Sequence, residues 1–155
     1  ILLSATSEKR VAGVVMRMGI PYASDSPQTK GLLYALSTGV ATLIGSGNIY
    51  WPHIHAADAA QAIHLALEHS PSGEVFNACD DEPVTMKKFF NDVAMWVGGP
   101  APRDGGKAGT PLPTARSFTP LYYSVRMSNE KLKQLGFRPG YPTYREGYQA
   151  VIEAQ

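Results

Sequence analysis

The sequence contains one cysteine, Cys79, among its 155 residues, and this scarcity excludes an internal disulfide framework. No apolar run approaches about 18 residues and no signal-peptide pattern is present, so nothing in the sequence indicates a membrane segment. The formal net charge is only +1 and the basic groupings are short, which argues against a broad nucleic-acid-binding surface. These absences predict a protein of a reducing compartment, and we expect the cytoplasm.

The sequence also has no initiator methionine, and no strand precedes the first strand that its pattern predicts. Residues 11–17 read as a strand, and Val11–Met16 carries no charge on either face. Such a strand is typical of the interior of a parallel sheet, with other strands on both sides. No preceding sequence supplies those strands. We therefore expect the chain to be the second half of a larger enzyme.

With 44% hydrophobic and 17% charged residues, the chain has the composition of one globular domain. A second strand is expected at Glu74–Ala78, with short extended segments at Ala41–Ile44 and Trp51–His55 and loops at 18–27 and 99–120. Apolar spacing and capping residues predict helices at Lys30–Ser37, Ala57–His69, Met86–Val97, Asn129–Leu135 and Tyr144–Ala154.

The order of these elements predicts an α/β fold in which strands 11–17 and 74–78 lie parallel in one sheet. Residues 28–72 and 99–155 are expected to form a small lobe beside that sheet, in a single incomplete domain. Within the helix at Ala57–His69, one apolar stripe is expected to face the core, formed by Ala59, Ala60, Ile63, Ala66 and Leu67. Ser128 is expected to cap the helix that follows it.

The isolated polar residues have structural explanations. Asp58 lies in the first turn of a helix, where a carboxylate interacts favourably with backbone N–H groups. His53 and His55 share one strand face, but a metal site needs a third ligand and a second shell, so no metal is expected. Acidic residues follow Cys79, and negative charge raises a thiol pKa, so this cysteine is expected to be an unreactive core residue.

Four segments, taken in order, resemble the C-terminal half of the extended and atypical short-chain dehydrogenase/reductases, the NAD-dependent epimerase/dehydratase family. They are Val14–Ala23, which is similar to the family's Leu-Arg-Pro-x-x-x-Tyr-Gly-Pro strand and loop; Trp51–Ala60, similar to its Val-His-x-x-Asp-x-Ala segment; Glu74–Thr85; and Ser128–Gly147. The resemblance covers nearly the whole chain. It implies the last strands of a Rossmann-like, doubly wound parallel sheet with a small substrate-binding lobe.

The same resemblance implies where function would lie. In the family the backbone at Met18, Gly19, Ile20 and Pro21 lines the nicotinamide end of an NAD or NADP site, and Tyr22 lies near a small-molecule substrate. Tyr123 and Arg126 lie in a region that closes over the substrate, although ordinary packing explains them equally well. Trp51 stands where members acting on nucleotide sugars often carry Arg, which argues against a nucleotide-sugar substrate.

The family's catalytic Tyr-x-x-x-Lys and glycine-rich phosphate turn would lie upstream of Ile1, and no catalytic residue is expected in this chain. The turn at Gly45–Asn48 joins two short strands and so lacks the strand-to-helix context of a phosphate cradle. One hypothesis is therefore the substrate-binding portion of an NAD(P)-dependent oxidoreductase or epimerase, completed by an N-terminal half. The alternative is a stand-alone, non-catalytic binding or interaction module, dimeric because a second copy covers strand 11–16.

Overall fold

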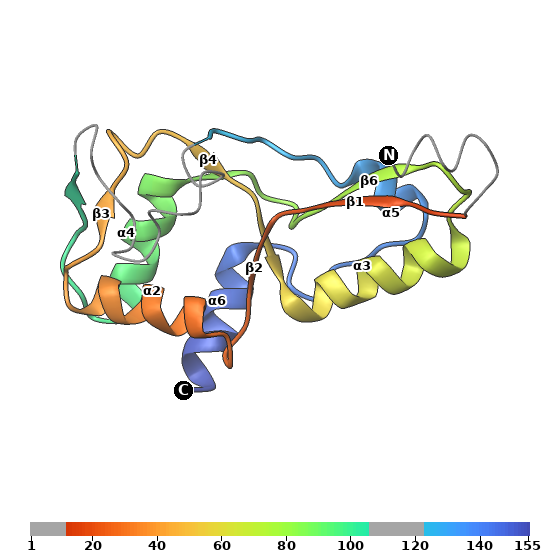
Figure 1. The fold of residues 1–155 in the computed structure, drawn as a ribbon. Helices are drawn as coiled ribbons and strands as arrows, with labels where there is room; N and C mark the ends of the chain where they lie inside the picture. The colour runs from red at the N-terminus through yellow and green to blue at the C-terminus, as the bar shows by residue number, and fades with distance from the viewer. Residues whose placement is uncertain (1–11, 106–122) are drawn as a thin grey trace.

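The computed structural model describes residues 12–105 and 123–155, and its elements are arranged in two groups (Figure 1). In the first group, β1 (Val15–Met18) and β6 (Val75–Ala78) pair in parallel, as predicted, with Arg17 opposite Asn77. The helices α3 (Ala56–His69) and α5 (Glu130–Gln134) lie against this pair. Their buried side chains form one apolar cluster, made of Ile54, Ala59, Ala62, Ala66, Phe76, Ala78, Leu132 and Phe137.

The second group contains the helices α2 (Pro27–Ser37), α4 (Met86–Trp96) and α6 (Tyr144–Glu153). Three short strand pairs accompany them: β2 (Ile20–Tyr22) parallel to β5 (His53–His55), β3 (Thr42–Leu43) parallel to β8 (Arg103–Asp104), and β4 (Tyr50–Trp51) antiparallel to β7 (Val84–Thr85). A second apolar cluster lies among these elements. The parallel pairs and the packed helices confirm the α/β class, while the sequence-based lobe boundaries remain a prediction.

Helix ends with strong local signals lie close to their expected positions. The Thr85 hydroxyl caps α4 by accepting from the N–H of Lys88, and Gly98 follows that helix with a φ of 71°. The helix α6 begins with a capping box between Thr143 and Glu146. The helix α2 starts three residues earlier than predicted, because Ser26 caps it and Pro27 occupies its first position.

Two strand predictions need correction. The strand expected at 11–17 is β1 at Val15–Met18; Val11 lies outside the described residues, and β1 is half-buried with Arg17 exposed rather than fully buried. The segment expected to be a loop at 18–27 contains β2, whose partner β5 lies more than thirty residues away in the sequence. Three residues around a proline carry no periodic signal, so this pairing is visible only in three dimensions.

The buried face of α3 also differs from the predicted stripe. Ala59, Ala62 and Ala66 face the β1–β6 sheet, whereas Ile63 is 44% exposed and Leu67 is 73% exposed. Small side chains let the helix approach the sheet closely, so the larger aliphatic residues point outward. A prediction based on hydrophobicity alone therefore chooses Ile63 and Leu67, each one residue C-terminal to the alanine that is buried, Ala62 and Ala66.

The cap of α5 is a further correction. Asn129, not Ser128, is the N-cap residue, and the Ser128 hydroxyl accepts only a 3.4 Å bond from the N–H of Glu130. The Asn129 side-chain amide instead donates to the carbonyl of Cys79 at 2.8 Å and to Asp81 Oδ1 at 2.7 Å. This buried residue ties α5 to the end of β6.

The two groups of elements are tied together by Asp58. Its carboxylate, 4% exposed at the start of α3, accepts from the N–H of Gly140 at 2.7 Å and from the N–H of Tyr141 at 3.0 Å. These residues belong to the connection between α5 and α6, and the Tyr141 ring lies 4.0 Å from the His55 ring, measured between centroids. Asp58 therefore has a structural role, as predicted, although its bonds reach a distant segment as well as stabilising its own helix end.

Replacing Asp58 by Asn is expected to lower the free energy of unfolding by about 2–3 kcal/mol, because a buried charged acceptor is lost and an unpaired amide hydrogen is introduced. Urea unfolding followed by circular dichroism measures the change. The matched control is D25N at an exposed aspartate. Equal stability of D58N and D25N would contradict the role given to Asp58.

The packing of the second group includes a close contact between Tyr22 and Gly147. The Tyr22 ring is 2% exposed and stacks on Tyr148 with centroids 4.3 Å apart. A Cβ atom built on Gly147 would lie 2.7 Å from Tyr22 Cζ and would collide with the hydroxyl. The absence of a side chain in α6 is therefore what admits the tyrosine.

The variant G147A is accordingly expected to lose about 1–3 kcal/mol or more of stability through overpacking. The control G31A should gain about 0.5–1 kcal/mol, because a Cβ at that exposed position in α2 meets nothing within 4 Å and alanine favours the helix. Thermal and urea unfolding of both variants provide the measurement. A neutral G147A would show that the ring moves aside at no cost.

Candidate functional site

A cavity of about 380 Å³ opens at the carboxyl ends of β1 and β6. Arg17 and Met18 come from β1, Asn77 comes from β6, and the remaining lining residues Val125, Arg126 and Met127 come from the segment before α5. The carboxyl edge of parallel strands is where open α/β sheets place their ligands. We therefore take this cavity, here called the strand-end pocket, as the candidate site.

Each wall of the strand-end pocket is held by backbone structure. The β1–β6 register sets Arg17 beside Asn77, and the Asn77 amide donates to the carbonyl of Ser128 at 3.1 Å. The opposite wall is tied to β4, because the N–H of Val125 donates to the carbonyl of Tyr50 and the N–H of Tyr50 donates to the Ser124 hydroxyl, both at 3.0 Å. In Figure 1 this segment runs from the β4 region across to α5.

The strand-end pocket is positively charged. Among the described residues no aspartate or glutamate lines it, and neither Arg17 nor Arg126 forms an ion pair. The Arg126 guanidinium lies 4.8 Å from the centre of the Tyr50 ring, in a cation–π contact. This arrangement can bind and orient a polar ligand, but the pocket lining offers no acid, base or nucleophile for chemistry.

The structure brings together two of the predicted site residues, Met18 and Arg126, on opposite sides of the strand-end pocket. Tyr123 is 62% exposed, and it does not line the pocket. Tyr22 lies in the core of the second group, away from the pocket lining. Their assignment to substrate, like that of Met18–Pro21 to cofactor, stays a prediction.

Sequence analysis missed Asn77 as a lining residue, and it placed Arg17 at the start of the candidate segment without giving its side chain a role. A signal for both was present, since each lies near the carboxyl end of a predicted parallel strand, where a ligand is expected. Val125 and Met127 carried no such signal, because their position depends on hydrogen bonds to β4 that no local pattern reveals.

The four residues that the family resemblance assigns to the cofactor, Met18–Pro21, lie in different surroundings. Met18 is the last residue of β1 and lines the pocket, and its assignment to the nicotinamide end stays a prediction. Gly19 is explained by packing, because a Cβ there would lie 3.2 Å from the carbonyl oxygens of Pro52 and His53. Ile20 and Pro21 continue into β2. No helix in the described ranges begins at a glycine-rich turn, so the phosphates lack a cradle there.

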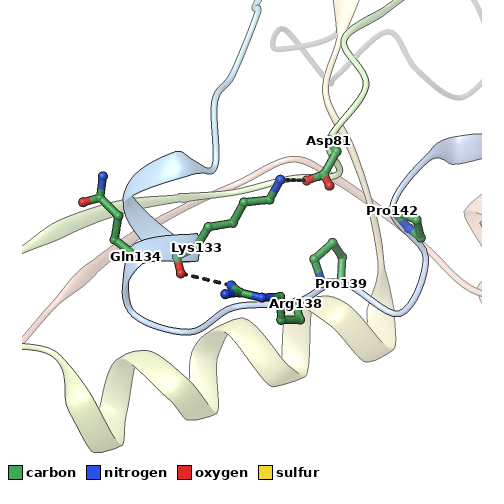
Figure 2. Close-up of a pocket in the computed structure, with 6 residues that line it drawn as sticks. All are labelled: Asp81, Lys133, Gln134, Arg138, Pro139 and Pro142. Atoms are coloured by element: carbon green, nitrogen blue, oxygen red, sulfur yellow. Dashed lines mark hydrogen bonds and ion pairs between the residues drawn. The ribbon is translucent and has the colours of Figure 1, made fainter.

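A second cavity, of about 430 Å³, lies between α5 and the connection to α6 (Figure 2). Its lining includes Lys133 and Arg138, but their donors already have partners. The Lys133 ammonium pairs with Asp81 at 2.8 Å, and the Arg138 guanidinium donates to the carbonyls of Lys133 and Phe137 at 3.1 and 2.7 Å. These contacts stabilise the junction between α5 and the segment that follows β6.

Several buried polar groups lie in or near β5. His53 is 1% exposed, and neither of its ring nitrogens has a hydrogen-bond partner among the described residues; the same is true of the Tyr22 hydroxyl and Asp80 Oδ2. Burial lowers the pKa of His53 to about 3. Burial and the negative charges of Asp81 and Glu82 raise the pKa of Asp80 to about 8. At neutral pH the histidine is thus neutral and the aspartate is largely protonated.

These two shifts predict a flat region in the pH dependence of stability. Because the pKa of Asp80 is raised on folding, its contribution to stability is complete below pH about 4 and is lost as the pH rises through 8. Because the pKa of His53 is lowered on folding, its contribution is complete above pH about 6.5 and is lost as the pH falls toward 3. Between pH about 4 and 6.5 the two slopes cancel, because folding moves one proton from the imidazole to the carboxyl group. Above pH 6.5 stability should fall by up to roughly 1.4 kcal/mol per pH unit.

Urea unfolding of the wild type, D80N and H53L from pH 3 to 9 measures this effect. Relative to the wild type, D80N should lose the alkaline decline and gain stability with pH between about 4 and 6.5, since only the histidine slope remains. H53L should instead decline throughout pH 4–8. Parallel profiles of all three proteins would contradict the assignment.

The remaining candidates behave as structural residues. Burial, followed by the charges of Asp80 and Asp81, raises the pKa of the Cys79 thiol to about 12, the direction predicted from its acidic neighbours. Within residues 12–105 and 123–155 no cluster of three His, Cys, Asp or Glu side chains could hold a metal ion. Over the same ranges, no helix combines the length and apolarity needed to cross a membrane.

Residues 2–79 match the model of the family described as "NAD dependent epimerase/dehydratase family". The chain is 27% identical over 147 residues to a 3-diazoavenalumate denitrifying reductase from a Streptomyces species, covering 88% of this chain and 46% of the reductase. A functionally unknown conserved protein from Silicibacter pomeroyi is similar in structure, with 31% identity and a TM-score of 0.72, over 91% of this chain and 49% of that protein.

The human epimerase family protein SDR39U1, solved with NADPH, has the same fold, with a TM-score of 0.77 at 21% identity. The match covers 92% of this chain and 48% of the human protein. The chain therefore spans about half the length of these relatives.

Proposed function

The chain belongs to the NAD-dependent epimerase/dehydratase family, and from this premise we propose that it is the substrate-binding portion of an NAD(P)-dependent oxidoreductase or epimerase acting on a sugar or an alcohol. The observation that carries the proposal is the strand-end pocket. It lies at the carboxyl edge of β1 and β6 and joins Met18, at the expected nicotinamide end, to Arg126, in the expected substrate region.

In this proposal the residues of the chain bind and orient rather than react. Met18 supplies an apolar surface beside the cofactor, and the amide of Asn77 and the guanidinium of Arg126 hold the substrate against it. The nicotinamide ring, when bound, exchanges a hydride with the substrate. The groups that activate the substrate hydroxyl and hold the dinucleotide phosphates come from a cofactor-binding half.

Two features of the first group of elements support such a partner. Within the described residues β1 is hydrogen-bonded only to β6, so its other edge can accept a further strand. The helix α3, which belongs to the same group of elements, exposes Ile63 and Leu67 to solvent on its outer face. We propose that the cofactor-binding half covers both, as an alternative to a second copy of this chain.

The strand-end pocket can be tested with methionine methyl NMR, since Met18 and Met127 line it. Nicotinamide mononucleotide should shift these two methyl signals, and so should at least one member of a panel of sugars, sugar alcohols, sugar acids and sugar phosphates. The buried Met86 and the exposed Met95, both in α4, serve as internal controls and should not move.

Shifts confined to the α4 methionines would contradict the proposed site. Oxidation of any panel member by the purified chain with NAD or NADP would contradict the proposal that the chemistry is supplied elsewhere. A symmetric dimer in sedimentation, together with no ligand effect on Met18 or Met127, would favour the non-catalytic module instead.

A further inference from the structure

We propose that the strand-end pocket selects an anionic ligand, a small molecule bearing a carboxylate or a phosphate that is held between Arg17 and Arg126. This inference rests on the proposed substrate-binding function and adds the chemical class of the ligand. It concerns the two guanidinium groups of the pocket, of which sequence analysis had given a binding role only to Arg126.

The first guanidinium is positioned by the sheet. Arg17 lies opposite Asn77 in the parallel register of β1 and β6, so the two side chains project from the same face and line the same pocket. The Asn77 amide nitrogen is engaged by the carbonyl of Ser128, which orients the side chain. Arg17 has no hydrogen-bond or ion-pair partner among the described residues.

The second guanidinium reaches the pocket from the opposite wall. Arg126 lies 4.8 Å from the centre of the Tyr50 ring, and the strand segment that carries it is hydrogen-bonded to the Tyr50 backbone. The contact with the ring restricts the side chain without neutralising its charge. Its N–H donors therefore remain available for a ligand.

Charge pairing elsewhere in the described residues makes this pair distinctive. Four cations at other packed junctions have carboxylate partners, in the pairs Lys88–Asp92, Lys131–Glu74, Lys133–Asp81 and Arg145–Glu82, and Arg138 donates to two backbone carbonyls. In the second cavity (Figure 2) Asp81 neutralises Lys133. The strand-end pocket has two arginines and no such carboxylate in its described lining.

Two guanidinium groups facing one cavity match the chemistry of an oxyanion. Each group is planar and can donate two parallel N–H bonds to a carboxylate or phosphate, which a neutral hydroxyl cannot accept with equal strength. A volume of about 380 Å³ is suited to a small molecule, within the usual range of ligand pockets. A neutral sugar would leave both charges uncompensated.

The test uses three probes of similar size: glucose, glucuronate and glucose 1-phosphate. Both anions should shift the Met18 and Met127 methyl signals in a saturable manner, whereas glucose at equal concentration should not. Comparison of the two anions shows whether the carboxylate or the phosphate binds more tightly. Added salt should weaken both, because the pocket is partly exposed to solvent.

Single variants R17Q and R126Q should each weaken anion binding by about tenfold or more, since each removes charged hydrogen bonds. The matched control R103Q changes an exposed arginine on β8, outside the pocket lining, and should leave binding unchanged. Urea unfolding of the three variants checks that all of them keep the wild-type fold.

The inference is overturned if neither anion shifts the two methyl signals, if glucose binds as tightly as the anions, or if R17Q and R126Q bind like R103Q. In the latter two cases the pocket still binds ligand, so the proposed function stands and only the charge selectivity fails. If the sugar alcohols and nicotinamide mononucleotide also leave Met18 and Met127 unmoved, the proposed function fails as well.

Discussion

The Asp58 carboxylate is the interaction on which the arrangement of the two groups of elements depends. Asp58 lies in the first turn of α3, which packs on the β1–β6 pair. Its carboxylate accepts hydrogen bonds from Gly140 and Tyr141, and these residues lead into α6 in the other group. With this connection fixed, α6 lies against β5 and presents Gly147 to Tyr22. This buried acceptor, together with the bond from the N–H of Asp81 to the carbonyl of Pro142, holds the connection that leads into the last helix.

The same contacts change how the family resemblance is understood. Asp58, Gly19 and Tyr22 all lie in segments that resemble family motifs, and each has a packing explanation in the structure. Gly19 allows the chain before β2 to approach the Pro52–His53 backbone, and Tyr22 packs against Gly147. Asp58 links α3 to the connection between α5 and α6. A motif of this kind can therefore identify the fold through residues whose work is structural, without placing them at the reacting atoms.

Local signals explain which elements could be predicted. The helix α4 has an N-cap threonine and a glycine beyond its last turn, and both were visible in the sequence. The β2–β5 pair could not be predicted, because its stability comes from a partner far along the chain rather than from periodicity. The buried face of α3 was misplaced for a related reason: the spacing of the helix from the sheet, which selects alanine, is a property of the packed pair and not of the helix alone.

The candidate site was partly predictable for the opposite reason, since the carboxyl edge of a parallel sheet is a position that topology alone defines. Predicting two parallel strands was sufficient to identify where Arg17 and Asn77 would meet, but the wall carrying Arg126 required the hydrogen bonds to Tyr50. That wall has a consequence for selectivity. Because it comes from a segment between the two groups of elements, the separation of the two guanidinium groups depends on the packing of α5 and β4 as well as on the sheet. The size of the anion that the pocket admits is therefore set by the connection between these elements, whereas its charge is set by the two arginines.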